Sequence, residues 1–202
     1  MTTSRALVTG ASQGVGLEVA RQLAKRGYDV VLTAEDDALE SAAARTRAYG
    51  TRVKSVRLDL RREEGVEELL HRVPEDLVDV LVGTATAFDA TPAGAGGPAA
   101  VDPGVRSAVR LAERVLLSML ARGSGKVLFA LPVAEAVPES RRGDHRATEA
   151  FLLASADRLR AAAGEQGVSV TVVRPEPQDT ALAVARRGCE ALVRGEAEVL
   201  PG

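Results

Sequence analysis

The chain contains few aromatic residues, a single cysteine and almost no net charge. Aromatic side chains make up 2% of its 202 residues and tryptophan is absent, so alanine, valine and leucine must fill the core. Cys189 has no second cysteine to pair with, which excludes an internal disulfide and favours a reducing compartment. A formal charge of −2 gives no electrostatic reason to expect nucleic acid or an anionic membrane as a partner.

Long apolar runs are also missing. No segment approaches the roughly 20 apolar residues that span a bilayer, and residues 1–5 lead directly into a first strand, which leaves no room for a signal peptide. We therefore expect a cytoplasmic protein without membrane attachment. The length suits one domain over residues 1–202.

Apolar runs and segments of helical period alternate along the whole chain. Continuous runs such as 78–82 and 168–173 suit strands that are covered on both faces. Strict alternation predicts an α/β fold with a doubly wound parallel sheet, Rossmann-like and three-layered. Strands are expected at 5–9, 28–33, 52–58, 78–83, 125–131, 168–174 and 197–200, and helices at 14–26, 36–49, 63–72, 104–122, 145–165 and 180–194.

Two segments show no period. Residues 84–104 are rich in alanine, glycine and proline, and residues 132–144 form a polar stretch. In a doubly wound sheet both segments would leave the carboxyl ends of strands, where ligands bind. The alternative is that both are ordinary surface loops.

The most distinctive motif is the glycine-rich turn Thr9–Gly16 (TGASQGVG), which lies between an apolar strand and a helical segment. Its spacing is G-x-x-x-G-x-G. Gly10 allows the tight turn, Gly14 lets backbone approach a phosphate, and Gly16 allows the helix to pack closely. In this setting a helix N-terminus faces a pyrophosphate.

With Thr9 in front, the turn resembles the cofactor loop of the short-chain dehydrogenase/reductase family, and the resemblance covers essentially the whole chain. Asp59 and Leu60 resemble the pair that contacts adenine in that family; the alternative is that Asp59 caps the helix at 63–72. The cofactor-binding residues predicted in this way are Gly10, Ser12, Gln13, Gly14, Val15, Gly16, Glu35, Asp59, Leu60 and Ala85.

The end of the second strand bears on which nucleotide could bind. Family members that prefer NADP commonly carry arginine where Glu35 stands and often a basic residue where Gln13 stands. Glu35 would repel a 2′-phosphate, while the usual ribose-binding aspartate position aligns with Ala34. We therefore expect weak binding of NAD and still weaker binding of NADP; the alternative is a vestigial pocket that binds neither.

The catalytic residues that the resemblance implies are absent. The chain has no Tyr-x-x-x-Lys; His145 stands at the tyrosine position and Glu149 at the lysine position. Leu131 and Pro132 replace the serines after the fifth strand, and the asparagine position falls near Gly104. We therefore predict no catalytic residue of the usual kind and no metal site.

Two features bear on whether another chemistry could operate. His145 and Glu149 lie four residues apart on one helix face, so they could form an acid/base couple, or only a surface ion pair with Asp144 as N-cap. The family's substrate-covering insertion is reduced to residues 175–180, although Thr180 matches a threonine that contacts the nicotinamide amide.

The sequence thus favours a catalytically degenerate family member that acts as a structural or regulatory subunit. The alternative is an atypical NAD(P)-dependent oxidoreductase, or a non-redox lyase, isomerase or cyclase using His145. The helices at 104–122 and 145–165 carry broad apolar sets, and in the resembled family these helices pair across a two-fold axis. We expect a homo-oligomer, or a hetero-oligomer with an active paralogue; the alternative is that both sets cover only their own sheet.

Overall fold

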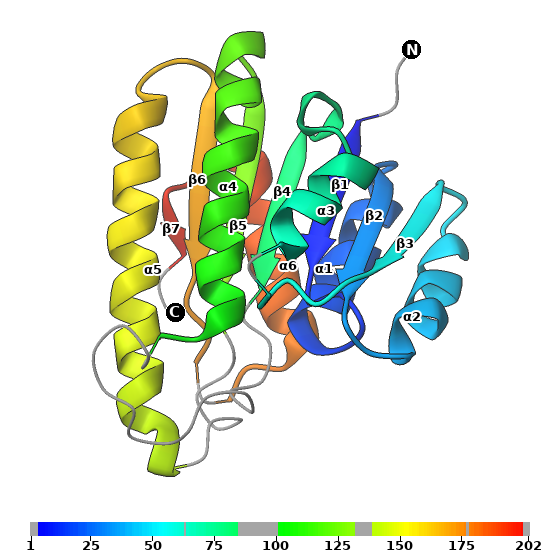
Figure 1. The fold of residues 1–202 in the computed structure, drawn as a ribbon, viewed down its shortest axis with the longest axis horizontal. Helices are drawn as coiled ribbons and strands as arrows, with labels where there is room; N and C mark the ends of the chain where they lie inside the picture. Colours follow the sequence, from blue (N-terminus) through cyan, green and yellow to red (C-terminus); the bar gives the residue numbers. More distant parts are fainter. Residues whose placement is uncertain (1–3, 63, 85–100, 132–138, 177, 200–202) are drawn as a thin grey trace.

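The computed structural model describes residues 4–62, 64–84, 101–131, 139–176 and 178–199. Their strands form one parallel sheet of seven strands in the order β3-β2-β1-β4-β5-β6-β7 (Figure 1). The strands are β1 (Arg5–Thr9), β2 (Asp29–Ala34), β3 (Val53–Arg57), β4 (Val80–Thr84), β5 (Gly125–Ala130), β6 (Val168–Val173) and β7 (Glu198–Val199).

The strand order reverses between β1 and β4. The chain runs outward from β1 through β2 to β3 and then returns to pair β4 with the other side of β1. In doubly wound sheets, ligands bind in the crevice outside the carboxyl ends of the strands at such a reversal. The predicted fold class is confirmed, and the crevice lies where the glycine turn leaves β1.

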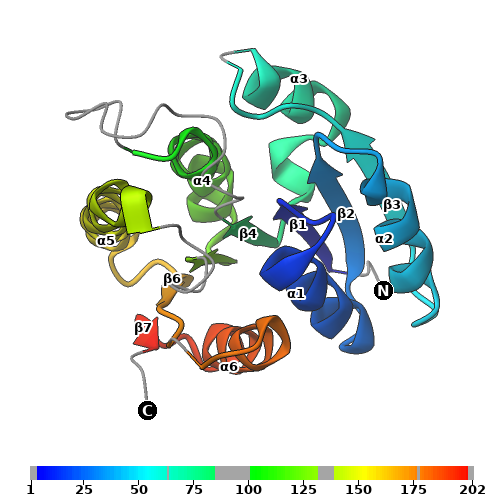
Figure 2. The same ribbon diagram turned by 90° about the horizontal axis from the view of Figure 1, so that it is seen from below.

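Helices cover both faces of the sheet. Figure 2 shows α3, α4 and α5 on one face and α1, α2 and α6 on the other, and the buried side chains accordingly form two apolar clusters. The helices are α1 (Gly14–Lys25), α2 (Ala38–Arg47), α3 (Gly65–Arg72), α4 (Pro103–Arg122), α5 (Arg142–Ala163) and α6 (Ala181–Arg194), with short 3₁₀ helices η1 (Glu75–Leu77) and η5 (Glu139–Arg141).

Local sequence explains how several helices begin and end. The carboxylate of Asp102 accepts a hydrogen bond from the Val105 amide at the start of α4, and Pro103 occupies the first helical position. Gly123 ends α4 with a left-handed φ of 66°. These capping signals explain why the predicted bounds of α4 differ by only one residue.

The predicted start of α5 was wrong. The helix begins at Arg142, so residues 142–144 are helical and Asp144 lies in the first turn rather than at the N-cap. Arg142 and Gly143 are exposed, and exposed residues at a helix start carry no apolar period. Sequence patterning therefore missed this turn.

The broad apolar set of α4 is used largely within the chain itself. The residues concerned are buried against the sheet: Val105, Ala108, Val109, Ala112, Val115, Leu116 and Met119. On the outer surface of the two helices, Leu117 is 68% exposed, and Ala150 and Ala154 on α5 are also exposed. Most of this set is therefore buried within the chain, while association through the outer surface of the two helices stays a prediction.

Alanine, valine and leucine dominate the core, as the scarcity of aromatic residues predicted. Phe129 on β5 is the exception, because its ring is 1% exposed and fills the space beside Gly83 on β4. A Cβ at Gly83 would lie 2.9 Å from both the Phe129 ring and the Ala108 methyl group. The absence of a side chain at Gly83 thus makes room for the one fully buried aromatic ring among the described residues.

We predict that Phe129→Ala lowers the free energy of unfolding by roughly 3–5 kcal/mol, because it leaves a cavity between two strands and α4. The matched control is Leu117→Ala, which removes an exposed side chain and should change stability by less than about 0.5 kcal/mol. Urea unfolding monitored by circular dichroism measures both. Equal effects for the two variants would contradict the packing described here.

Candidate nucleotide-binding crevice

The glycine turn has the geometry expected of a phosphate cradle. Gly10 and Gly14 adopt left-handed φ values of 58° and 59°, which side chains rarely tolerate. A Cβ at Gly16 would collide with the carbonyl oxygen of Gly10, whereas the space beside Gly14 is open. The backbone can therefore be approached at Gly14 while α1 packs tightly on the turn.

The N-terminus of α1 is left without a side-chain cap. Its N-cap is Gln13, whose side chain makes no capping hydrogen bond and is exposed. The first N–H groups of a helix have no partner within the helix and carry a partial positive charge. The turn therefore offers backbone donors that fit the pyrophosphate of a dinucleotide.

Two threonines join the turn to the strand across the crevice. The Thr84 hydroxyl at the end of β4 donates to the Thr9 carbonyl oxygen at 2.7 Å, and the Thr84 amide donates to the Thr9 hydroxyl at 3.2 Å. Both side chains are buried. These bonds hold the ends of β1 and β4 together at the topological switch point, and no sequence motif had identified Thr84.

Ser12 has a structural partner within the chain. Its buried hydroxyl donates to one oxygen of Asp36 at 2.7 Å, and the other oxygen of Asp36 accepts from the Ala38 amide at 2.9 Å. Ser12 therefore ties the glycine turn to the start of α2. The adjacent Val15 is partly buried against the apolar cluster on this face.

An acid–arginine triad lies at the ends of β2 and β3. Arg61 forms an ion pair with Glu35 and donates from Nε to Asp59 at 3.0 Å. These hydrogen bonds outweigh burial and lower the pKa of Asp59; burial raises the pKa of Glu35 and is opposed by the charge of Arg61. Glu35 and Asp59 are thus brought together as predicted, but with a cation that the sequence reading had not identified.

The alternative capping role of Asp59 is wrong. Its carboxylate accepts from the amide of Arg61 at 2.9 Å, whereas the N-cap of α3 is Glu64. A Cβ at Gly65 would collide with the Asp59 carbonyl oxygen, so α3 starts directly against the end of β3.

A groove of about 400 Å³ opens beside Glu35 and Asp59. Leu60 packs against the core, and Ala85 lies outside the described residues.

At the other end of the crevice, α5 presents His145 and Glu149. Arg174, directly after β6, donates from Nε to Glu149 at 2.8 Å. Burial lowers the pKa of the half-buried His145, and the charge of Glu149 partly offsets this. Leu131 is buried at the end of β5, and Pro132 lies outside the described residues. Glu149, which the sequence analysis aligned with the family's lysine, is thus bound to an arginine.

The segments around this end are held by their own polar contacts. The Asp102 amide donates to the buried Thr148 hydroxyl at 2.9 Å, which ties the start of α4, with Gly104 in its first turn, to α5. The Thr180 hydroxyl accepts from the Ala183 amide and caps α6. The structure therefore assigns Thr180 a capping contact.

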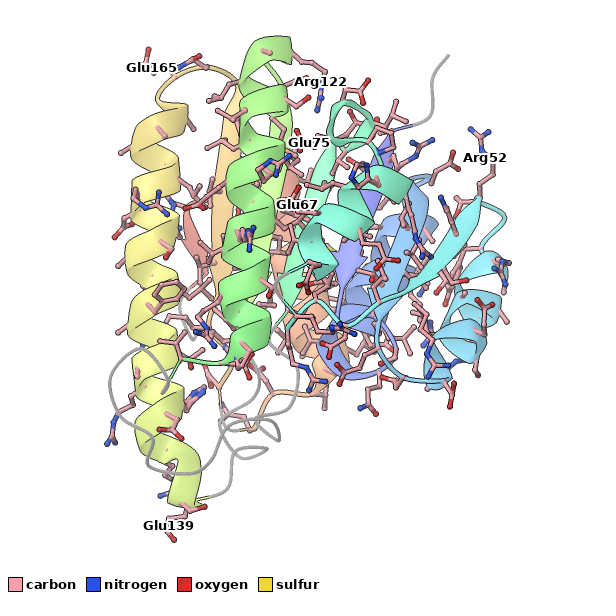
Figure 3. All side chains as sticks on the ribbon, viewed as in Figure 1. Arg52, Glu67, Glu75, Arg122, Glu139 and Glu165 are labelled. Atoms are coloured by element: carbon pink, nitrogen blue, oxygen red, sulfur yellow. The ribbon has the colours of Figure 1, made fainter. Side chains whose placement is uncertain are left out.

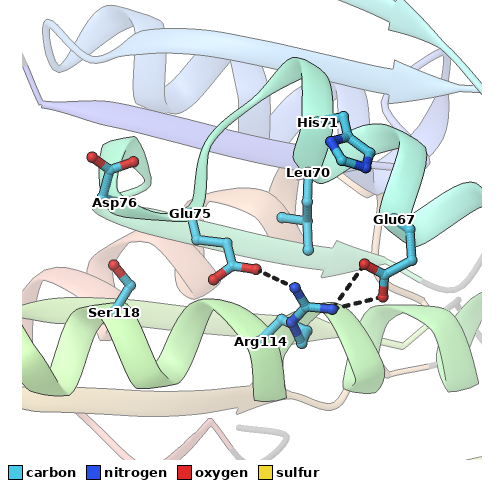
Figure 4. Close-up of a pocket in the computed structure, with 7 residues that line it drawn as sticks. All are labelled: Glu67, Leu70, His71, Glu75, Asp76, Arg114 and Ser118. Carbon is cyan, nitrogen blue, oxygen red and sulfur yellow. Dashed lines mark hydrogen bonds and ion pairs between the residues drawn. The ribbon is translucent and has the colours of Figure 1, made fainter.

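A second groove, of about 310 Å³, lies between α3, η1 and α4 (Figure 4). Arg114 donates to both oxygens of Glu67, at 2.6 and 2.9 Å, and to Glu75 at 2.8 Å. Figure 3 shows Glu67 and Glu75 on this helical face of the molecule. These bonds let Arg114 join α4 to α3 and η1. The charged side chains of this groove therefore have a packing role, and we assign no ligand to them.

The described residues contain no cluster of three or more histidine, cysteine, aspartate or glutamate side chains that could hold a metal ion. None of the helices among them is both long enough and apolar enough to cross a bilayer.

Known proteins resemble this chain over most of its length. The family model for short chain dehydrogenase matches residues 4–190. Glycine betaine reductase ATRR of Emericella nidulans is 32% identical over 200 residues, which cover 93% of this chain but only 15% of that protein. Sulfoacetaldehyde reductase 2 of Chromohalobacter salexigens is 28% identical over 190 residues, 90% of this chain and 75% of that protein.

Solved structures also resemble this chain in fold. The bulky-bulky ketone specific alcohol dehydrogenase of Comamonas testosteroni has a TM-score of 0.84 at 23% identity, over 98% of this chain and 86% of that one. L-Sorbose reductase of Gluconobacter frateurii, solved with NADPH and L-sorbose, has a TM-score of 0.71 at 26% identity, over 87% of this chain and 70% of that one. Since the family model spans nearly the whole chain, this protein belongs to the short-chain dehydrogenase family.

Proposed function

We propose that this protein binds a nicotinamide dinucleotide without performing the usual hydride transfer of its family, and that it acts as a structural or regulatory subunit. The observation that carries the proposal is the replacement of the tyrosine–lysine pair by His145 and Glu149, with Glu149 bound to Arg174. The related dehydrogenases and reductases support nucleotide binding in general.

The chemistry of these replacements opposes carbonyl reduction. A bound dinucleotide would supply the hydride, so the chain itself must polarise the carbonyl and deliver a proton. Leu131 has no hydroxyl to polarise it, and Glu149 is an anion where a cation is needed to lower the pKa of the acid and hold the ribose. General acid/base groups typically contribute 10²- to 10⁴-fold in rate, and that contribution is lost here.

Nucleotide choice depends on the triad at the ends of β2 and β3. Glu35 is an exposed acid beside the position of the adenosine ribose, where a carboxylate favours free hydroxyls and opposes a phosphate. The ion pair of Arg61 with Glu35 weakens the repulsion between Glu35 and a phosphate, but it does not turn that repulsion into an attraction. NAD is therefore the proposed nucleotide.

We predict weak NAD binding by the wild type, with NADP binding weaker still. Glu35→Arg should lower the ratio of the NADP to the NAD dissociation constant at least about tenfold, because an acid–phosphate repulsion becomes an attraction. Glu35→Gln is the matched control and should give an intermediate ratio. Isothermal titration calorimetry measures all three; tighter binding of NADP than NAD by the wild type would sink the proposal.

We predict no measurable nicotinamide-dependent turnover on a broad panel of aldehydes, ketones and alcohols. The missing proton donor, cation and hydroxyl account for this together. Absorbance at 340 nm over long incubations, at saturating NAD(H) and NADP(H), is the measurement. Steady turnover that disappears in His145→Ala would contradict the prediction and favour the second candidate function.

That second candidate is an atypical oxidoreductase, or a non-redox lyase, isomerase or cyclase, in which His145 moves a proton. It is favoured by the half-buried position of His145 near Glu149, at the helix position where the family keeps its acid/base residue. A neutral imidazole can accept a proton near neutral pH. Against it stands Arg174, which engages the carboxylate that would have to orient the imidazole.

The pKa of His145 should lie below 6.5 in the native protein, because burial disfavours the imidazolium ion. Glu149→Gln should lower the pKa further by removing the offsetting charge. With the folded pKa below the unfolded one, His145 reduces stability as pH falls from about 6.5 through its native value. NMR titration of the imidazole, assigned with His145→Gln, tests this; a native pKa above 6.5 would show the burial argument to be wrong.

A partner role needs a surface for association. The outer side of α4 and α5 carries the exposed Leu117, Ala150 and Ala154, while the Glu113–Arg158 ion pair joins the two helices. Alanine at exposed positions lets another backbone approach closely. Self-association through this surface, or pairing with an active paralogue, is the proposed arrangement.

Ala154→Glu should dissociate the assembly, since it places a charge at the centre of this surface. Ala44→Glu, on the exposed side of α2 across the sheet, is the matched control and should leave the assembly unchanged. Size-exclusion chromatography with light scattering measures the mass, with co-expressed family paralogues as the second arm. A monomer that captures no paralogue would remove this support for a partner role.

A further inference from the structure

Four arginines converge on a small groove between the starts of α3 and α4. The groove has a volume of about 210 Å³, and Arg61, Arg62, Arg106 and Arg110 line it together with Ser107. Arg61 and Arg62 come from the β3–α3 connection, whereas Arg106 and Arg110 lie one turn apart on α4. Two segments about 45 residues apart in the sequence thus contribute charges of the same sign to one place.

Among the described residues that line this groove, none carries a carboxylate. Arg61 is held at its edge by Glu35 and Asp59, and Arg110 lies 3.7 Å from Glu67, which Arg114 already engages through both oxygens. The acids Glu35, Asp59 and Glu67, which contact these groove arginines, are thus each paired with an arginine.

Arg62 and Arg106 are the two groups that the fold leaves available. Within the described ranges, neither guanidinium forms a salt bridge or a side-chain hydrogen bond, and both residues are exposed. Asp102, buried beneath the start of α4, attracts Arg106 at longer range. Like charges that converge without an acid between them repel, and an anion placed among them removes that repulsion.

We propose that this arginine groove binds an oxyanion of the phosphate class. Guanidinium groups present planar pairs of N–H donors that match phosphate oxygens, and their hydrogen bonds to an anion are strong. The volume suits a phosphate or a small phosphate ester rather than a whole dinucleotide. The groove is separate from the glycine turn, so this proposal is independent of the proposed function.

Such an anion has two possible sources. One is the phosphate of a small ester, whose size the groove would admit. The other is free inorganic phosphate. Both present the same dianionic group to Arg62 and Arg106.

Calorimetric titration of the purified chain with inorganic phosphate, at an ionic strength held constant with chloride, tests the proposal. The wild type should bind, and Arg62→Ala/Arg106→Ala should weaken binding at least tenfold. Arg45→Ala/Arg186→Ala removes two exposed arginines from α2 and α6 and should bind as the wild type does. Circular dichroism confirms that each variant is folded, which their exposed positions favour.

Two further arms separate the sites and the sources. Saturating NAD should leave phosphate binding intact; if NAD abolishes it in the wild type, the phosphate occupies the glycine turn and the proposal is overturned. Tighter binding of glycerol phosphate than of inorganic phosphate assigns the groove to a small phosphate ester, whereas equal or weaker binding assigns it to free phosphate. No binding by the wild type, or equal weakening in both double variants, overturns the proposal.

Discussion

The carboxyl edge of the sheet depends on a close approach between two backbone segments. The carbonyl oxygen of Gly10 occupies the space that a side chain at residue 16 would need, so α1 can start directly against the turn that leaves β1. The hydroxyl oxygen of Thr84 lies 3.1 Å from the position that a Cβ at residue 16 would take, and this hydroxyl donates to the carbonyl oxygen of Thr9. One contact therefore positions the turn, the helix N-terminus and the end of β4 at the strand-order reversal.

A similar constraint operates two strands away, where Gly65 lets α3 start against the carbonyl oxygen of Asp59. It holds Asp59 beside Glu35, and two carboxylates at such proximity repel each other. Arg61 lies between them and makes the arrangement stable. The adenosine end of the crevice is thus a preformed acid–arginine cluster.

At the opposite end of the crevice an arginine again neutralises a carboxylate. Glu149 would be an unpaired carboxylate on a partly buried helix face, and Arg174 from the end of β6 neutralises it. At both ends the chain supplies the countercharge to its own acids. A ligand that enters must compete with these contacts or bind the first backbone N–H groups of α1, which have no side-chain cap.

Much of the fold could be predicted from local pattern. Continuous apolar runs marked the strands and apolar residues at helical period marked the helices, because each signal acts over a few neighbouring residues. The start of α5 could not be predicted, since its first two residues, Arg142 and Gly143, are exposed and lack apolar period. Which part of the apolar set on α4 is buried within the chain could not be predicted for another reason: whether a residue faces its own sheet or the outer surface depends on packing angles that the sequence does not reveal.

The sequence by itself determined the doubly wound class and the glycine turn, because glycine spacing and strand–helix alternation are local properties. It also showed that the chain has no Tyr-x-x-x-Lys motif. Only the tertiary structure decided which charges meet. Arg61 joined Glu35, Arg174 joined Glu149, and four arginines from two distant segments met at one groove. Coulomb interactions depend on distance in space, and only the folded chain sets those distances.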